Sequence, residues 1–198
     1  MMKRIVLTGG PGSGKTVISR RLAEANPDRF VLVPEAATQV YTALQTRWDR
    51  LDLTGRRDVQ RRIYHTQVEQ EARLAREHPT KILLLDRGTI DGASYWPDGP
   101  DDYWRDLGTT RTVELKRYDA VIWLETCAAL GAGMYDGDAS NACRFEDAPA
   151  AVAAGQRLLA LWRDHPNLKH VGAFAVLDEK VQAVSELIEL ISSSNRRP

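Results

Sequence analysis

Residues 9–16, GGPGSGKT, match the pattern G-x-x-x-x-G-K-[ST], with an apolar run before them and a helical pattern after them. Such a loop wraps a polyphosphate in backbone N–H groups, because residues without side chains let the backbone approach and adopt positive φ angles. The positive end of the following helix dipole adds to this attraction. Lys15 supplies a point charge for the β and γ oxygens, and the Thr16 hydroxyl is placed to bind Mg²⁺.

This loop predicts a protein that binds a nucleoside triphosphate together with Mg²⁺. No N-K-x-D guanine-reading tetrapeptide occurs in the sequence, so ATP is the expected nucleotide. Lys15 is also a catalytic candidate, since its charge stabilises the phosphate that is transferred. The expected nucleotide contacts are Gly10, Pro11, Gly12, Ser13, Gly14, Lys15, Thr16 and Val17.

Two other apolar runs end in residues that could do chemistry. Glu35 follows VLVP, and Asp86 and Arg87 follow ILLL. Ligands bind at the carboxyl ends of the strands in open parallel sheets, so we expect these side chains to converge on the glycine-rich loop. Asp86 is then a ligand of Mg²⁺ beside Thr16, and Arg87 a catalytic clamp for a phosphate or carboxylate. Glu35 has two interpretations, a general base that also holds the substrate or a cap of the next helix.

The elements that must position these residues follow from the apolar pattern. Strands are predicted at 4–8, 30–33, 82–85 and 120–124, with a weaker fifth strand near 168. Each run is continuous rather than alternating, as expected when helices cover both faces of a parallel sheet. Helical patterns separate the strands, at 17–25, 36–47, 57–77, 110–117, 150–164 and 178–192. This alternation predicts a three-layer α/β fold.

Composition narrows the class of protein. At 198 residues the chain is most simply one domain, 1–198. Lys plus Arg and Asp plus Glu both number 27, so the net charge is zero and stable binding to nucleic acid is not expected. Cys127 and Cys143 are the only cysteines and lack the spacing of a metal site. No apolar run is long enough to span a membrane, and we expect a cytoplasmic monomer or homodimer.

The motifs GGPGSGKT, PEAA, LLLDRGTIDGASYW and CRFED, in this order, resemble a family of small phosphate-loop proteins described as AAA-type ATP-binding domains. That family is grouped with the nucleotide-kinase-like domain of ribosylnicotinamide kinases and is more distantly similar to thymidylate and deoxynucleoside kinases. The resemblance covers nearly the whole chain. It implies a P-loop NTPase fold with a five-stranded parallel sheet, ATP with Mg²⁺, and a mobile lid, but no single acceptor.

The lid is expected at about 131–148, a stretch rich in Gly and Asp that fits no element. In the related kinases the segment at this position folds over the triphosphate and supplies an arginine. The resemblance therefore points to Arg144 as a catalytic residue, since no other basic residue lies between Arg117 and Arg157. The alternative is that Arg144 pairs with a neighbouring carboxylate on a solvated loop.

Acceptor contacts are expected on the long helix and behind the third strand. Gln67 falls within an apolar stripe, where it reads a substrate ring or amide or bonds to a neighbouring backbone group. Tyr95 and Trp96 stack on a ring or belong to the core. The acidic segment 94–104 suits a cationic acceptor and equally an ordinary solvated loop. The expected substrate contacts are Glu35, Gln67, Arg87 and Asp91.

Two functions remain open at this point. The first is a kinase that transfers the γ-phosphate of Mg·ATP to a small hydroxyl-bearing, nucleoside-like molecule. The second is a regulatory module that uses bound ATP to order the lid and bind a protein or lipid partner, with no dedicated acceptor. The sequence favours the kinase, because Glu35, Asp86 and Arg87 supply more catalytic groups than binding alone needs.

Overall fold

The computed structural model describes residues 3–131 and 147–193. Its centre is a sheet of five parallel strands in the order β2-β3-β1-β4-β5. The strands are β1 (Arg4–Thr8), β2 (Phe30–Val33), β3 (Ile82–Asp86), β4 (Ala120–Leu124) and β5 (Leu168–Val171). All four strand pairs are parallel, which confirms the predicted sheet.

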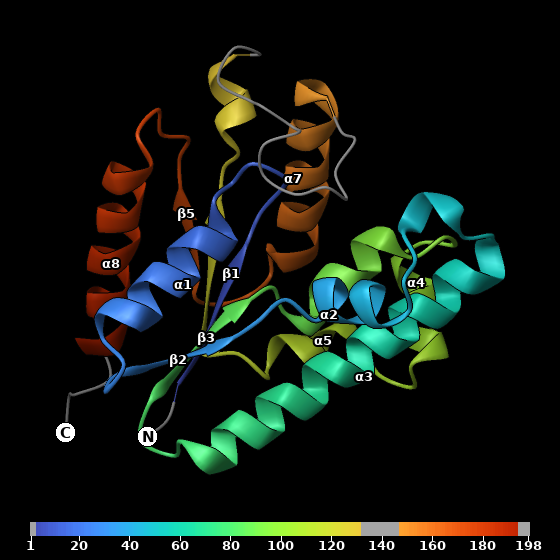
Figure 1. The fold of residues 1–198 in the computed structure, drawn as a ribbon, viewed down its shortest axis with the longest axis horizontal. Helices are drawn as coiled ribbons and strands as arrows, with labels where there is room; N and C mark the ends of the chain where they lie inside the picture. The colour runs from blue at the N-terminus through green and yellow to red at the C-terminus, as the bar shows by residue number, and fades with distance from the viewer. Residues whose placement is uncertain (1–2, 132–146, 194–198) are drawn as a thin grey trace.

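Helices cover both faces of this sheet, as Figure 1 shows. One face carries α1 (Lys15–Ala25) and α8 (Leu177–Ser193). The other face carries α3, α7 and several shorter elements. The elements on this side and near its edge are α2 (Ala36–Ala43), η1 (Trp48–Arg50), α3 (Leu53–Glu77), η2 (Thr89–Tyr95), α4 (Pro100–Asp106), α5 (Arg111–Leu115), η3 (Cys127–Leu130) and α7 (Ala148–Trp162).

The central strands are largely apolar because each side of the pleat meets a helical layer, whereas Lys169 and His170 of the edge strand β5 are exposed. Ile5 and Leu7 of β1 pack in the cluster under α1 and α8, whereas Val6 between them packs in the opposite cluster with Trp162 of α7. All four side chains are fully buried. A continuous apolar strand is the expected consequence of two covered faces, so the three-layer α/β prediction is confirmed.

The segment 94–104, which fits no element by sequence pattern, contains the end of η2 and the start of α4. Gly99 adopts a φ of 85°, and Pro100 then occupies the first position of α4, where a proline loses no helical hydrogen bond. The predicted helix at 36–47 was too long, since α2 ends at Ala43.

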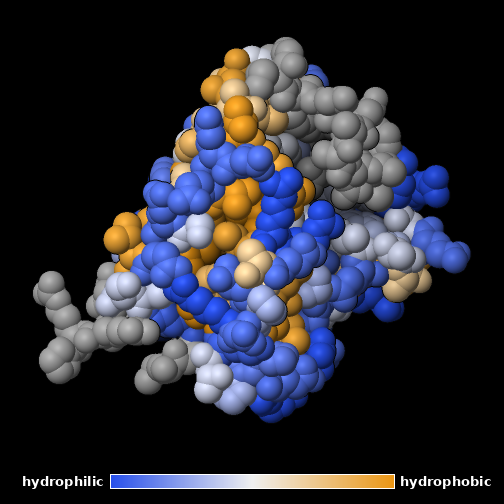
Figure 2. All heavy atoms as spheres, turned by 60° about the vertical axis from the view of Figure 1, so that its left-hand side comes forward, coloured by the Kyte–Doolittle hydropathy of each residue, from blue (hydrophilic) through white to orange (hydrophobic). Residues whose placement is uncertain are grey.

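On the face that Figure 2 presents, hydrophilic residues predominate and hydrophobic residues gather mainly toward the middle and the upper part. Within the described ranges, no helix combines the length and the apolar character needed to cross a membrane.

The strand register places three strand ends together. Leu7 of β1 is level with Asp86 of β3, and Leu85 is level with Val33 of β2. The loops after β1, β2 and β3 therefore leave the sheet at one edge.

Candidate active site at the carboxyl edge of the sheet

The glycine-rich loop joins β1 to α1 and takes a conformation that only glycine adopts easily. Gly9, Gly12 and Gly14 have φ angles of 146°, 71° and 84°. A Cβ atom on Gly10 would lie 2.5 Å from the carbonyl oxygen of Ala151 in α7. Gly14 is the N-cap of α1 and provides no side-chain cap, so the amides of the first turn stay available to an anion.

Lys15, Thr16 and Asp86 meet beside this loop. Lys15 begins α1 and is 2% exposed, and Asp86 ends β3 and is 1% exposed. Burial raises the pKa of Asp86, as does the nearby Glu35 carboxylate, whereas Lys15, a hydrogen bond from Thr16 and Arg87 oppose the increase. Oδ1 of Asp86 has no hydrogen-bond partner among the described residues. A hydroxyl beside a buried carboxylate oxygen without a partner fits the oxygen ligands that Mg²⁺ prefers.

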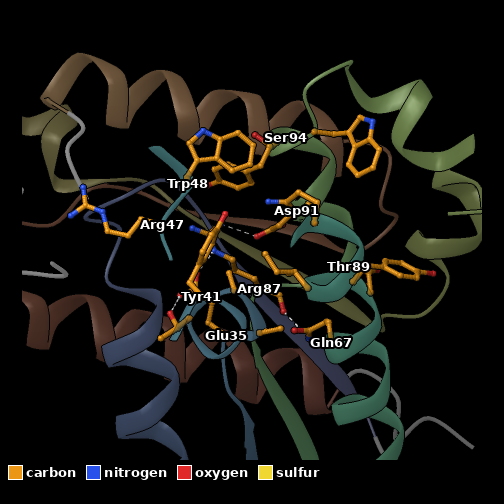
Figure 3. A pocket seen from close by; sticks show the side chains of 18 of the residues that line it. Glu35, Tyr41, Arg47, Trp48, Gln67, Arg87, Thr89, Asp91 and Ser94 are labelled. Atoms are coloured by element: carbon orange, nitrogen blue, oxygen red, sulfur yellow. Dashed lines mark hydrogen bonds and ion pairs between the residues drawn. The ribbon is translucent and has the colours of Figure 1, made fainter. Parts of the chain in front are cut away.

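Arg87 links two carboxylates across the same edge. Its Nε donates to Oε1 of Glu35 over 2.6 Å, and its Nη1 donates to Oδ2 of Asp91 over 3.1 Å. Figure 3 shows these side chains beside one another in the cavity. The φ angle of Arg87 is 76°, in the left-handed region that residues with a side chain rarely occupy. Such strain is typical of functional sites and holds the guanidinium in a defined direction.

Glu35 occupies the N-cap position of α2, but its side chain forms no cap hydrogen bond with the helix backbone. Its Oε2 instead accepts a hydrogen bond from the Thr38 hydroxyl over 2.7 Å. Burial by itself raises the pKa of Glu35, but Arg87, Lys15 and Thr38 together lower that pKa to about 2. The contacts of Glu35 therefore favour the interpretation of a charged site carboxylate over that of a cap.

Asp91 is 2% exposed and accepts hydrogen bonds from three side chains. Its oxygens accept from the Thr8 hydroxyl at 2.8 and 3.0 Å and from Nε1 of Trp162 at 2.6 Å, besides Arg87. Asp91 thus lines the cavity while anchoring β1, η2 and α7 to one another. Its direct effect is on the position of Arg87.

Gln67 of α3 also lines the cavity, and its amide nitrogen is engaged within the protein. It donates to Oε1 of Glu71 over 3.0 Å and to the carbonyl oxygen of Arg87 over 3.4 Å. Of the two interpretations of Gln67, the structure contains the second, a hydrogen bond to a neighbouring backbone group. This contact supports the strained residue that holds Glu35.

The cavity in front of these residues has a volume of about 900 Å³. Its wall includes Pro11 of the glycine-rich loop, so that loop and the Glu35–Arg87 pair border the same space. Trp48 and Tyr95 face each other edge to face, with ring centroids 6.5 Å apart. The other aromatic residues of the wall are Tyr41, Tyr64, Trp96 and Tyr103.

Sequence patterns missed part of this wall. Trp48 lies in a short 3₁₀ helix that has no periodic signal. Arg157 of α7 also lines the cavity and forms no hydrogen bond or ion pair within the described part of the chain. The only feature of the sequence that pointed to Arg157 was its position after the expected lid. Arg144 and most of the expected lid lie outside the described residues.

The acidic segment after η2 does not face the cavity as a free negative patch. Asp98 and Asp102 are bound by Arg57, and Asp106 accepts hydrogen bonds of 2.7 and 2.6 Å from Arg61. These contacts fasten α4 to α3 and neutralise the carboxylates. They support a structural interpretation of this segment rather than recognition of a cationic acceptor.

Two of three comparisons with known proteins found a match, and both matches agree with this architecture. A sequence model of a family described as an AAA domain matches residues 4–173. No curated protein matches the sequence. The fold is similar to that in the crystal structure of NadR protein in complex with NAD and AMP-PNP, with a TM-score of 0.67 and 18% sequence identity. The similarity covers 100% of this chain and 51% of the NadR chain, so this chain spans about half the length of that protein.

Proposed function

Because the chain belongs to the AAA domain family and its glycine-rich loop borders the same cavity as Glu35 and Arg87, we propose that it binds Mg·ATP and phosphorylates a small, nucleoside-like molecule. The single observation that carries this proposal is that shared cavity. A loop that only stored nucleotide would not need a buried carboxylate–guanidinium pair beside it. The NadR structure was solved with AMP-PNP, an ATP analogue, which supports ATP as the phosphate donor.

In this proposal the loop amides and Lys15 bind the phosphates, while Thr16 and Asp86 hold the metal. When bound, Mg²⁺ neutralises part of the negative charge on the β- and γ-phosphates. The acceptor hydroxyl lies in the cavity and donates a hydrogen bond to Glu35. A new bond then forms between the hydroxyl oxygen and the γ-phosphorus, the bond to the β-phosphate oxygen breaks, and ADP leaves.

Glu35 acts mainly by orienting the acceptor. With a pKa of about 2 it is ionised at neutral pH but is a weak base. Phosphoryl transfer passes through a loose transition state in which positioning and charge stabilisation matter most. The hydroxyl proton passes to Glu35 late in the transfer and from there to solvent.

A metabolite-pool screen tests this function directly. The protein is incubated with Mg·ATP and fractionated metabolites, and mass spectrometry detects a product that gains one phosphate group. The proposal expects ATP consumption to rise sharply when one compound is added. Slow hydrolysis that no metabolite changes, together with nucleotide-dependent capture of a protein or lipid, would instead select the regulatory module.

A further inference from the structure

Three consecutive carbonyl groups of the glycine-rich loop accept hydrogen bonds from outside the loop. Pro11 accepts from the Thr126 hydroxyl over 2.6 Å, and Gly12 accepts from the backbone N–H of Cys127 over 3.3 Å. Ser13 accepts from Nζ of Lys180 over 2.9 Å. In a trans peptide the carbonyl and the next N–H point in opposite directions. Holding the Ser13 carbonyl outward therefore turns the following amide toward the phosphate side.

Lys180 differs from the other two donors because it brings a charge from the far end of the chain. It belongs to α8 and is 4% exposed, and its ammonium group also donates to the carbonyl oxygen of Glu125 after β4. No ion pair joins Lys180 to a carboxylate among residues 3–131 and 147–193. The position also lies beyond residues 4–173, which the family model matches.

A buried ammonium group with carbonyl partners is costly for the folded protein. Burial lowers the pKa of Lys180 to about 8, although nearby Cys127 and Glu125 partly oppose this. A group that only stabilised the fold would be better replaced by an apolar side chain. A polyphosphate in the loop would add its negative charge to that of nearby Glu125 and so stabilise this ammonium group.

We propose that Lys180 is a positioning residue of the nucleotide site, which holds the Ser13 carbonyl outward and places a positive charge beside the loop. The C-terminal helix α8 then completes the anion cradle. This inference rests on the proposed function, because it requires that the loop binds a nucleotide.

The test compares Lys180→Met with Lys180→Arg in the full chain. Calorimetry measures the affinity for ATP and for ADP, and thermal unfolding without nucleotide measures stability. Lys180→Met should weaken the binding of both nucleotides by about tenfold or more. This factor corresponds to the loss of one charge-assisted hydrogen bond. Its melting temperature should stay within a few degrees or rise, because the buried charge is removed. Lys180→Arg keeps donor and charge and should bind within about threefold of the wild type.

Lys169→Met is the matched control, since Lys169 is an exposed lysine on β5. It removes the same charge and should leave both affinities unchanged. If Lys180→Met folds poorly, Lys180→Gln takes its place; it removes the charge but keeps a neutral N–H donor, so affinity should still fall, by less than for Lys180→Met.

The experiment distinguishes failure of the proposed function from failure of the positioning role of Lys180. A wild-type protein that binds neither ATP nor ADP would defeat the proposed function itself. A wild type that binds them, with Lys180→Met binding equally well, would overturn only the positioning role. An equal fall of stability and affinity in both Lys180→Met and Lys180→Arg would assign Lys180 to the structure of the fold instead.

Discussion

Arg87 and Glu35 lie 52 positions apart, yet Nε of Arg87 donates to Oε1 of Glu35 over 2.6 Å. The pair exists because β2 and β3 are neighbouring parallel strands, so the residues that follow them leave the sheet at one edge. Lys15 acts on both Glu35 and Asp86 through its charge. Lys15 of the glycine-rich loop, Asp86, Glu35 and Arg87 thus form one connected group of charges.

Glu35→Gln should abolish most of the turnover while leaving ATP affinity within about twofold, because in the proposed reaction Glu35 acts on the acceptor hydroxyl rather than on the nucleotide. Phosphorylation of the acceptor found by the screen and ATP binding by calorimetry check this. Glu35→Asp is the control, as it keeps the charge but shortens the reach, and it should retain partial activity. Normal turnover by Glu35→Gln would show that Glu35 has no catalytic role.

The low pKa of Glu35 predicts how stability depends on pH. The folded pKa of about 2 lies below the ordinary value of 4.5, so the unfolded chain binds more protons between these values. The stabilisation from ionised Glu35 is fully present above pH 4.5 and is lost as the pH falls toward 2. Its full size is about 3 kcal/mol.

Denaturant unfolding from pH 6 to 3 measures this effect against Glu35→Gln, which cannot titrate at this position. The stability difference between wild type and variant should shrink steadily below pH 4.5. A constant difference across the range would mean that Glu35 has an ordinary pKa in the folded protein.

Arg87→Met should lower the free energy of unfolding by about 3 kcal/mol, because it leaves Glu35 and Asp91 as buried carboxylates without their shared partner. Arg87→Lys should lose less, since an ammonium group can still reach one carboxylate but not hold both in a fork. Chemical denaturation gives both values. Arg62→Met, at an exposed position of α3, is the control and should stay within about 0.5 kcal/mol of the wild type. An equally small loss for Arg87→Met would contradict the bridging role.

Asp86→Asn should remove most of the gain in ATP affinity that Mg²⁺ provides, because a neutral amide is a poorer ligand for the hard cation. Affinity without the metal should be unchanged or higher, since a negative charge near the phosphates is lost. Calorimetry with Mg²⁺ and with a chelator separates the two effects. The same metal-dependent gain in variant and wild type would exclude Asp86 as a ligand.

Arg157→Ala should reduce kcat by about tenfold or more with little change in ATP affinity, if its guanidinium reaches the phosphate during transfer across the cavity. Steady-state kinetics with the identified acceptor provide the values. Arg163→Ala removes an exposed arginine at the end of the same helix and serves as the control. Equal kinetics in the two variants would place Arg157 outside the reaction.

Local pattern was enough to predict the glycine-rich loop and the strands. The loop needs glycines at set spacing whatever surrounds it, and the four strong apolar runs need only be buried on both faces, whereas the fifth strand, with exposed Lys169 and His170, gave a weaker pattern. Because all the strands are parallel, the positions of Glu35, Asp86 and Arg87 at one edge followed from their order in the sequence. The sequence order did not predict that Arg87 pairs with Glu35, because this contact depends on side-chain distances across two strands.

By itself, the sequence determined the fold class, the anion-binding loop and the edge of the sheet where chemistry can occur. Only the tertiary structure decided how that edge is used. It brought Trp48 opposite Tyr95, gave Asp91 a hydrogen bond from Trp162, and placed Lys180 of the last helix against the Ser13 carbonyl. These are contacts between residues far apart in the chain, and no local periodicity records them, because their energy depends on packing in three dimensions.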